Sequence, residues 1–236
     1  CILGRGPKYV FKNAKLRKYF KEVSMHSYWS GADTKKNAEN YFSDKYSKYS
    51  VAATEYCQMT DDKNTGVYDL IAKEKNGTNG TSIKYGVAMA NTIVDDLTIM
   101  NANEWDWWTA CSYGTYTDGL IYLDEDNHEN LDFSKRYYCL GNFSKFIKEG
   151  AVRVACSSGV KNVRSVAFVN EDNTVVTVYV NNNDKKAYTT IDCEGDYAVY
   201  TTDRDNDIAK TDFGKAKKVK VSLPASSVVT VVYEAK

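Results

Sequence analysis

Two different patterns of hydrophobic positions divide the chain near residue 140. In the first part, short apolar runs alternate with stretches whose apolar residues recur at helical spacing. A strand followed by a helix, repeated along the chain, is typical of parallel β/α units. The apolar runs predict strands at 22–29, 49–56 and 102–108, and the helical spacing predicts helices at 12–20, 35–48 and 83–100.

From residue 151 onward, Val, Tyr and Thr alternate with polar residues between turn-forming segments. A spacing of about ten residues between successive strands is typical of an antiparallel β-sandwich. The expected strands are 163–170, 174–182, 186–195, 196–203, 217–223 and 226–235, with a turn at 194–196. We therefore predict an α/β part at 1–140 and a β-sandwich side domain at 141–236.

The composition narrows the classes of partner. The 31 basic and 31 acidic side chains balance, so the chain has no net field that would attract nucleic acid or an anionic membrane. The aromatic content is high, with 19 Tyr, 4 Trp and 8 Phe, and rings of this kind suit stacking on sugars, although Tyr is also common on β-rich surfaces. None of the six cysteines forms a Cys-x-x-Cys pair, so we expect no zinc site. Nothing else in the sequence implies a metal or an organic cofactor.

Polar and aromatic side chains gather where three of the predicted strands end. Parallel β/α barrels form their active sites at the carboxyl ends of the strands. Glu55 is a carboxylate in this position, and a glycosidase uses such a group to attack the anomeric carbon of a sugar. The candidates for sugar contact around it are His26, Tyr28, Trp29, Tyr56, Trp105 and Trp107.

Each candidate also has a purely structural interpretation. Glu55 could end a strand in a surface ion pair, and His26 could be a satisfied structural histidine. Trp105 and Trp108 could pack in a core. The residue types alone leave these alternatives open.

Five segments resemble glycoside hydrolase family 30 in their order. They are "VSMHSYW", "AATEYC", "ANEWDWW", "DGLIYLD" and "KRYYCLGNFSKFIKEGAVRV". That family joins a (β/α)8 TIM barrel to a side β-sandwich, and the last segment resembles the junction, although Glu149 stands where the family often has Pro. The resemblance runs from about Val10 to Tyr233. It implies barrel strands six to eight, the C-terminal part of the barrel, followed by an antiparallel β-sandwich.

The resemblance also implies roles for the candidate residues. The family comprises retaining enzymes, and Thr54-Glu55-Tyr56 matches the motif that carries the nucleophile at the end of strand seven. Glu55 is therefore the expected nucleophile. The segment 26–29 matches the end of strand six, where Tyr28 would lie beside the nucleophile.

Strand eight supplies the last part of the expected site. Trp107 matches the tryptophan that forms a wall of the sugar subsite. Because side chains alternate along a strand, Trp105 should face the same side as Trp107, and Asp106 and Trp108 should face the other.

The substrate expectation is a plant cell-wall polysaccharide outside the cell. "TEYC" and "DGLIYLD" are most similar to the endo-β-1,6-galactanase branch of the family. Hydrolysis of glucuronoxylan or of another β-glycan is the first alternative. A carbohydrate-binding protein without catalysis, using Tyr28, Trp29, Trp105 and Trp107, is the second.

A retaining mechanism needs a second carboxyl group, which the family places in an Asn-Glu-Pro motif on strand four. The chain has only two prolines, Pro7 and Pro224, and neither follows Asn-Glu. It also begins without Met or a charged-then-apolar signal segment. We therefore expect the N-terminal half of the barrel to lie on a longer polypeptide or a partner chain, and the 236-residue chain alone to be inactive.

Overall fold

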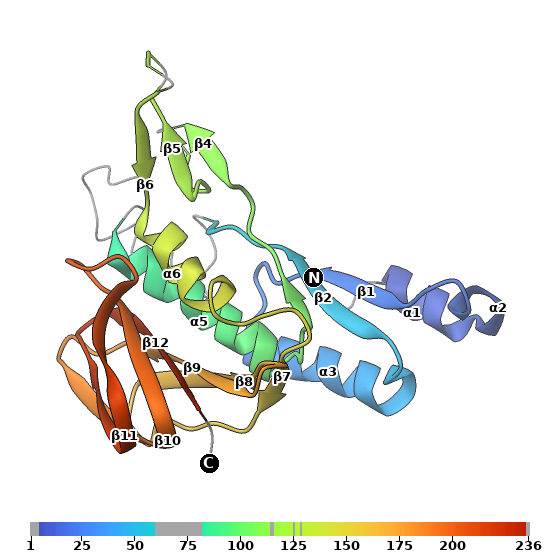
Figure 1. Ribbon diagram of the computed structural model, residues 1–236. Helices are drawn as coiled ribbons and strands as arrows, with labels where there is room; N and C mark the ends of the chain where they lie inside the picture. Colours follow the sequence, from blue (N-terminus) through green and yellow to red (C-terminus); the bar gives the residue numbers. More distant parts are fainter. Residues whose placement is uncertain (1–4, 60–81, 114–115, 125, 128, 235–236) are drawn as a thin grey trace.

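The computed structural model describes residues 5–59, 82–113, 116–124, 126–127 and 129–234. It contains a small parallel sheet flanked by helices and a larger antiparallel sheet, with helix α5 (Ile83–Thr98) between them (Figure 1). The predicted fold class is confirmed. No helix among the described residues is long and apolar enough to cross a membrane.

The parallel sheet is the barrel part. Its strands follow the order β1-β2-β3, and each pairs in parallel with the next. The strands are β1 (Glu22–His26), β2 (Ser50–Glu55) and β3 (Glu104–Trp105), and the helices before α5 are α1 (Arg5–Lys12), α2 (Ala14–Arg17) and α3 (Ala32–Tyr46). A break at Asn13, whose side chain accepts a hydrogen bond from the Lys15 backbone N–H, divides the predicted helix 12–20 into the end of α1 and α2.

One face of the parallel sheet is covered by helices. Val23 and Met25 of β1 pack with Val51 of β2 against Ala38 and Phe42 of α3 in a shared apolar cluster. Residues between them in sequence, such as Ser24, are exposed on the opposite face. This alternation follows from the period of two in a strand, and it shows which face of the sheet is free of α3.

A three-stranded sheet follows β3 and precedes helix α6 (Lys135–Ser144). The sequence pattern predicted none of these strands. Its middle strand pairs in parallel with one neighbour and antiparallel with the other. The strands are β4 (Cys111–Tyr113), β5 (Ile121–Leu123) and β6 (Leu131–Phe133).

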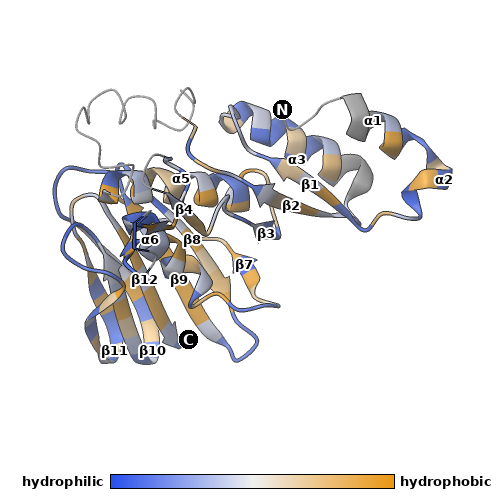
Figure 2. Cartoon of the chain, turned by 90° about the horizontal axis from the view of Figure 1, so that it is seen from above, coloured by the Kyte–Doolittle hydropathy of each residue, from blue (hydrophilic) through white to orange (hydrophobic). Residues whose placement is uncertain are grey.

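The sandwich is built on a six-stranded sheet in the order β11-β10-β12-β9-β8-β7. Its central strands are apolar on both faces, as their colours in Figure 2 show. One face packs on α5 and α6, with Val176, Val178 and Val180 of β9 against Met89 and Ile93. The strands are β7 (Val152–Val154), β8 (Val163–Val169), β9 (Thr174–Asn181), β10 (Ala187–Thr202), β11 (Ala209–Leu223) and β12 (Ser227–Glu234).

The second layer of the sandwich comes from the same sheet. The β10–β11 ribbon is paired along nearly its whole length, but only the part of β10 from Tyr197 onward also pairs with β12. The rest of the ribbon carries Ile191 and Cys193 into a cluster with Val229 on the other face of the sheet. Gly195, with φ of +122°, lies where the β10–β11 register shifts. The predicted turn at 194–196 is therefore wrong, because the two predicted strands form one bent strand.

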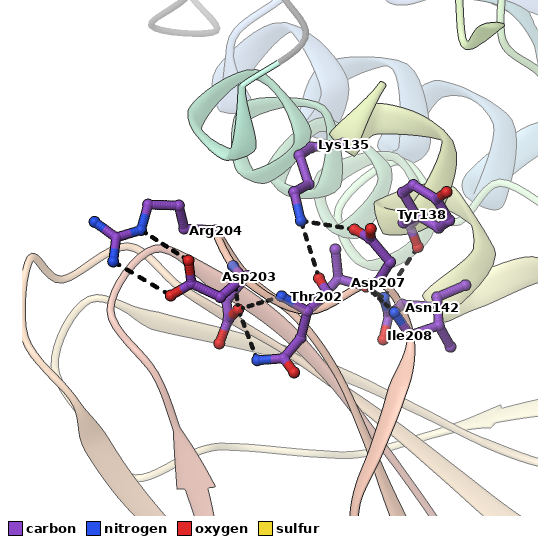
Figure 3. A network of polar contacts seen from close by, with 10 residues as sticks. Lys135, Tyr138, Asn142, Thr202, Asp203, Arg204, Asp207 and Ile208 are labelled. Atoms are coloured by element: carbon purple, nitrogen blue, oxygen red, sulfur yellow. Dashed lines mark hydrogen bonds and ion pairs between the residues drawn. The ribbon is translucent and has the colours of Figure 1, made fainter. Parts of the chain in front are cut away.

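Polar contacts join α6 to the loop between β10 and β11 (Figure 3). Lys135 binds the Asp207 carboxylate at 2.6 Å. The amide of Asn142 donates to the hydroxyl of Thr202 at 2.5 Å, and the hydroxyl of Thr230 donates to the backbone carbonyl of Asn142 at 2.7 Å. Asn142, Thr202 and Thr230 are fully buried, so these bonds fix the sandwich on α6. The predicted domain boundary at residue 140 falls inside this helix and remains a prediction.

Candidate active site

A bulge at the end of β2 determines where Glu55 points. Met25 of β1 pairs with Ala53, but the next β1 residue, His26, pairs with Glu55, so Thr54 is an extra residue on β2. A bulge re-aims the side chains that follow it. Glu55 thereby shares a face with His26, on the side of the sheet opposite α3.

The other neighbour of β2 shows the same extra residue. The backbone N–H of Asp106 donates to the Ala53 carbonyl at 2.8 Å, and that of Trp108 donates to the Tyr56 carbonyl at 3.0 Å. The step from Asp106 to Trp108 is two residues long, whereas the matching step on β2, from Ala53 to Tyr56, is three residues long. Because both N–H groups point toward β2, the chain stays extended, and the side chains of Asp106 and Trp108 lie on the face of Glu104.

Two side chains of β1 and its following loop contact the Glu55 carboxylate. The hydroxyl of Tyr28 donates a hydrogen bond to Oε1 at 3.1 Å. Nδ1 of His26 lies 3.6 Å from the same oxygen. The Glu55 side chain is 32% exposed and that of His26 is 48% exposed, so the carboxylate is held but accessible.

The hydroxyl of Tyr28 is itself oriented by Cys57. The backbone N–H of Cys57 donates to the Tyr28 hydroxyl oxygen at 3.1 Å, and the thiol lies 3.5 Å from it. A phenol has one hydrogen, and an ionised carboxylate can only accept, so that hydrogen goes to Glu55. Burial is the largest cause that raises the pKa of Tyr28 above its usual range, and the contacts with Cys57 and Glu55 raise it further. The hydroxyl therefore stays a donor at neutral pH.

An aromatic layer lies behind the Glu55 carboxylate. Tyr56 is fully buried and stacks on Tyr28, with ring centroids 5.5 Å apart and an interplanar angle of 28°. Its ring also lies 6.1 Å from that of Trp105 and 6.0 Å from that of Trp107. The rings of Trp105 and Trp107 are 6.3 Å apart, which agrees with their predicted common face.

Trp105 is fixed by a buried carboxylate on α5. Its indole N–H donates to Asp96 at 2.9 Å, and the hydroxyl of Ser27 donates to the same group at 2.8 Å. Lys35 of α3 forms an ion pair with Asp96 at 2.8 Å, and both side chains are almost entirely buried. Burial raises the pKa of Asp96, and the Lys35 charge opposes that shift. Trp105 is thus anchored to helix α5 through Asp96.

Trp107 is fixed by a buried arginine on α6. Its indole N–H donates to the Asp118 carbonyl at 2.6 Å, and the Arg136 guanidinium lies 5.5 Å from the centre of its ring. Arg136 is fully buried and donates hydrogen bonds to Gln58 Oε1 and to the carbonyl of Gly119, both at 2.9 Å for the closest nitrogens. Burial lowers the pKa of Arg136 from its usual value. Trp107 is therefore part of a packed support beneath the strand ends.

Two tryptophans near the strand ends are exposed. Trp29 follows Tyr28, is 50% exposed and has a left-handed backbone with φ of +53°. Trp108 is 54% exposed and lies on the same face of the sheet as Asp106. The alternation of side chains predicts Trp108 on the face opposite Trp107, but it does not show that Glu55 shares the face of Trp108. The bulge, which the sequence pattern does not reveal, is the reason.

Within the described ranges, no group of three or more His, Cys, Asp or Glu side chains is placed to hold a metal ion. The cysteines that the structure describes are free thiols. The chemistry available at the site is that of a carboxylate, a phenol, an imidazole and aromatic faces.

Comparison with known proteins assigns both parts of the chain to glycoside hydrolases. Residues 5–122 match the model described as O-glycosyl hydrolase family 30, and residues 150–231 match the model described as the glycosyl hydrolase family 30 beta sandwich domain. The chain belongs to glycoside hydrolase family 30. The predicted resemblance is confirmed.

Solved structures share the fold. A GH30 endoxylanase from Clostridium papyrosolvens C71 is 20% identical with a TM-score of 0.74, covering 96% of this chain and 52% of its own. A conserved exported protein from Bacteroides fragilis is 24% identical with a TM-score of 0.71, with coverages of 90% and 46%. The catalytic domain of GH30 xylanase C from Talaromyces cellulolyticus is 20% identical with a TM-score of 0.69, with coverages of 97% and 48%. The chain thus spans about half the length of each.

Proposed function

We propose that this chain carries the nucleophile half of the active site of a retaining glycoside hydrolase, with Glu55 as the nucleophile. The supporting observation is the bulge at Thr54 together with the hydrogen bond from Tyr28. The bulge turns a partly exposed carboxylate to the free face of the sheet at a strand end, where parallel barrels bind substrate.

The mechanism follows from the two roles of the carboxylate. Glu55 attacks the anomeric carbon, and the bond from that carbon to the leaving oxygen breaks as a glycosyl–enzyme ester forms. The leaving oxygen takes its proton from a second carboxyl group about 5–5.5 Å from Glu55, which then removes a proton from the attacking water. We propose that this acid/base belongs to a part of the barrel outside these 236 residues, since the matching structures are about twice as long.

The aromatic residues divide into two groups in this proposal. His26, Trp29 and Trp108 contact the sugar directly, because they are exposed on or beside the Glu55 face. Tyr28 holds the nucleophile. The predicted sugar contacts of Tyr56, Trp105 and Trp107 remain untested, and their packing favours a supporting role.

For the substrate, we propose β-1,6-galactan of the plant cell wall, acted on outside the cell. The basis is the similarity of "TEYC" and "DGLIYLD" to the galactanase branch. Xylan is the competing substrate, because two of the similar structures are xylanases. An extracellular location is consistent with the similar protein described as exported.

The decisive experiment traps the intermediate. A longer protein that contains the complete barrel is treated with a fluorinated glycosyl inhibitor, and the labelled peptide is mapped. We expect the label on Glu55 and no label in Glu55→Gln. A label on any other residue would refute the assignment of the nucleophile.

Two further assays separate the remaining parts of the proposal. Hydrolysis of galactan, xylan and glucan by the longer protein tests the substrate, and faster release from xylan would overturn the galactan assignment. The 236-residue chain alone should show no hydrolysis. Hydrolysis by that chain that disappears in Glu55→Gln would show that its second carboxyl group is already present.

A further inference from the structure

A buried carboxylate behind the strand ends joins several elements of the barrel part. Asp96 of α5 is fully buried. Its Oδ1 accepts a hydrogen bond from the hydroxyl of Ser27 at 2.8 Å and pairs with the Lys35 ammonium at 2.8 Å, and its Oδ2 accepts one from the Trp105 indole at 2.9 Å. Asp96 therefore ties the chain after β1, the helix α3 and the strand β3 to α5.

Ser27 stands between the two residues that contact the Glu55 carboxylate. Its neighbours are His26 and Tyr28, which lie 3.6 Å and 3.1 Å from Oε1 of Glu55. The Ser27 side chain points the other way, toward α5, and is 1% exposed. Because Ser27 is covalently joined to both neighbours, holding its side chain limits the movement of the backbone from which His26 and Tyr28 project.

The backbone after Ser27 leaves the sheet in a local turn. β1 ends at His26, and the backbone N–H of Ser30 donates to the Ser27 carbonyl at 3.2 Å. The turn passes through Trp29, whose φ is +53°. These bonds join residues close in the sequence, whereas the bond from Ser27 to Asp96 joins residues 69 positions apart. That bond anchors the turn to α5.

The other oxygen of Asp96 reaches the same tyrosine through packed rings. Trp105 is held by Oδ2 of Asp96, and its ring lies 6.1 Å from that of Tyr56. Tyr56 in turn stacks on Tyr28, with ring centroids 5.5 Å apart. Two routes from one buried carboxylate therefore meet at Tyr28, one through the Ser27 backbone and one through Trp105 and Tyr56.

The placement of Ser27 exceeds what stability alone requires. A buried carboxylate needs a cation and further hydrogen bonds to its remaining lone pairs, and Lys35 and Trp105 already supply the cation and one such bond. A donor from any neighbouring element would meet the rest of this need. Ser27 meets it from the position between His26 and Tyr28, which favours a role in the geometry around Glu55.

We propose that Ser27 is a positioning residue for the reaction at Glu55. Its hydrogen bond to Asp96 sets the distance of His26 and Tyr28 from the carboxylate, and no bond to Ser27 forms or breaks in the reaction. Small displacements of groups that orient a reacting atom slow the chemical step more than they weaken binding. This inference rests on the proposed function, because it takes Glu55 as the nucleophile.

The rate at which a fluorinated glycosyl inhibitor labels Glu55 tests this role. In the longer protein with a complete barrel, saturation kinetics separate the dissociation constant of the inhibitor from the first-order rate constant of labelling. Ser27→Ala should lower the rate constant about tenfold and leave the dissociation constant within about twofold, because the buried Ser27 side chain does not contact the sugar. Ser27→Thr keeps a hydroxyl and should restore most of the rate.

Ser227→Ala is the matched control. Ser227 is also fully buried, and its hydroxyl donates to the Pro224 carbonyl at 2.7 Å, but it lies in the sandwich. This variant should be labelled as fast as the parent protein. Thermal unfolding gives a working temperature at which all variants are folded, so a serine that only stabilises the fold would leave both constants unchanged.

The possible results separate this inference from the assignment of the nucleophile. Equal rate constants in Ser27→Ala and the parent, with Glu55 labelled in both, would overturn the role of Ser27 alone. An equal loss in Ser227→Ala, or a loss that Ser27→Thr does not restore, would overturn it as well. A label on another residue of the parent protein would refute Glu55 as the nucleophile and this inference with it.

Discussion

The hydroxyl of Tyr28 and the carboxylate of Glu55 are joined by a 3.1 Å hydrogen bond whose direction is fixed by the backbone N–H of Cys57. Because that N–H occupies the phenol oxygen, the single phenol hydrogen is directed at the carboxylate. Tyr28 therefore orients the Glu55 carboxylate.

Removing this hydroxyl should slow catalysis. In the longer protein with a complete barrel, Tyr28→Phe is expected to lower kcat/KM about 10- to 100-fold, because a hydrogen bond to a charged group is lost. Steady-state kinetics on the accepted polysaccharide measures the effect. Tyr49→Phe is the matched control, since the Tyr49 hydroxyl donates to the Arg17 carbonyl, and it should leave the kinetics unchanged. Unchanged kinetics in Tyr28→Phe would contradict the role of the bond.

Breaking the buried Lys35–Asp96 ion pair should strongly destabilise the barrel part. Asp96→Asn leaves the Lys35 ammonium buried without its carboxylate, so we expect the free energy of unfolding to fall by about 3–5 kcal/mol. Urea unfolding measures this loss. Asp205→Asn removes an exposed pair with Arg204 and should leave the stability nearly unchanged, because solvent screens exposed charges. Similar losses in the two variants would show that Asp96 is not the organising group.

Arg136→Lys should loosen the support beneath Trp107. Lysine cannot make the forked hydrogen bonds to Gln58 and Gly119, so we expect a loss of about 2–4 kcal/mol and a weaker near-ultraviolet dichroism signal. Arg204→Lys changes an exposed arginine and serves as the control. A full near-ultraviolet signal in Arg136→Lys would mean that Trp107 is held in place without the guanidinium.

Buried thiols should make the protein lose stability in alkali. Burial raises the pKa of Cys139, so this thiol stays protonated in the folded protein at pH values where a thiol of the unfolded chain, with a pKa of about 8.5, ionises. Above that pH the unfolded state binds fewer protons than the folded state, and stability falls as pH rises. Below it, the contribution of the thiol is fully present.

Thermal unfolding across alkaline pH measures this effect. The decline of Tm above about pH 8.5 should be shallower in Cys139→Ala than in the parent chain. Cys111→Ala removes an exposed thiol and should leave the slope unchanged. Equal slopes in the parent chain and in Cys139→Ala would refute the contribution of Cys139.

The strands around Glu55 could be predicted because their sequence pattern is local. The run 49–56 is apolar, and Glu55 ends it, so a strand with a carboxylate at its end follows from the residues alone. The extra residue at Thr54 could not be predicted, because it depends on how β1 and β3 pair with β2. The face shared by Glu55 and Trp108 was missed for this reason.

The bend in β10 shows a similar limit. Glu194, Gly195 and Asp196 are residues of the kind that form turns, and the sequence accordingly predicted a turn. In the folded chain, pairing with β11 continues on both sides of Gly195, so long-range hydrogen bonds override the local preference. The buried hydrogen bonds of Asp96 and Arg136 likewise could not be predicted from the local sequence pattern, because each bond joins residues far apart in the sequence.

The bent ribbon gives the side domain an unusual mechanical character. In a sandwich of two separate sheets, side chains alone join the layers, and the layers can slide past each other. Here the backbones of β10 and β11 run continuously from one layer into the other, so paired strands as well as side chains join the two layers. The same sheet is bonded to α6 through Asn142, so the bent ribbon braces the helix that carries Arg136 beneath the strand ends.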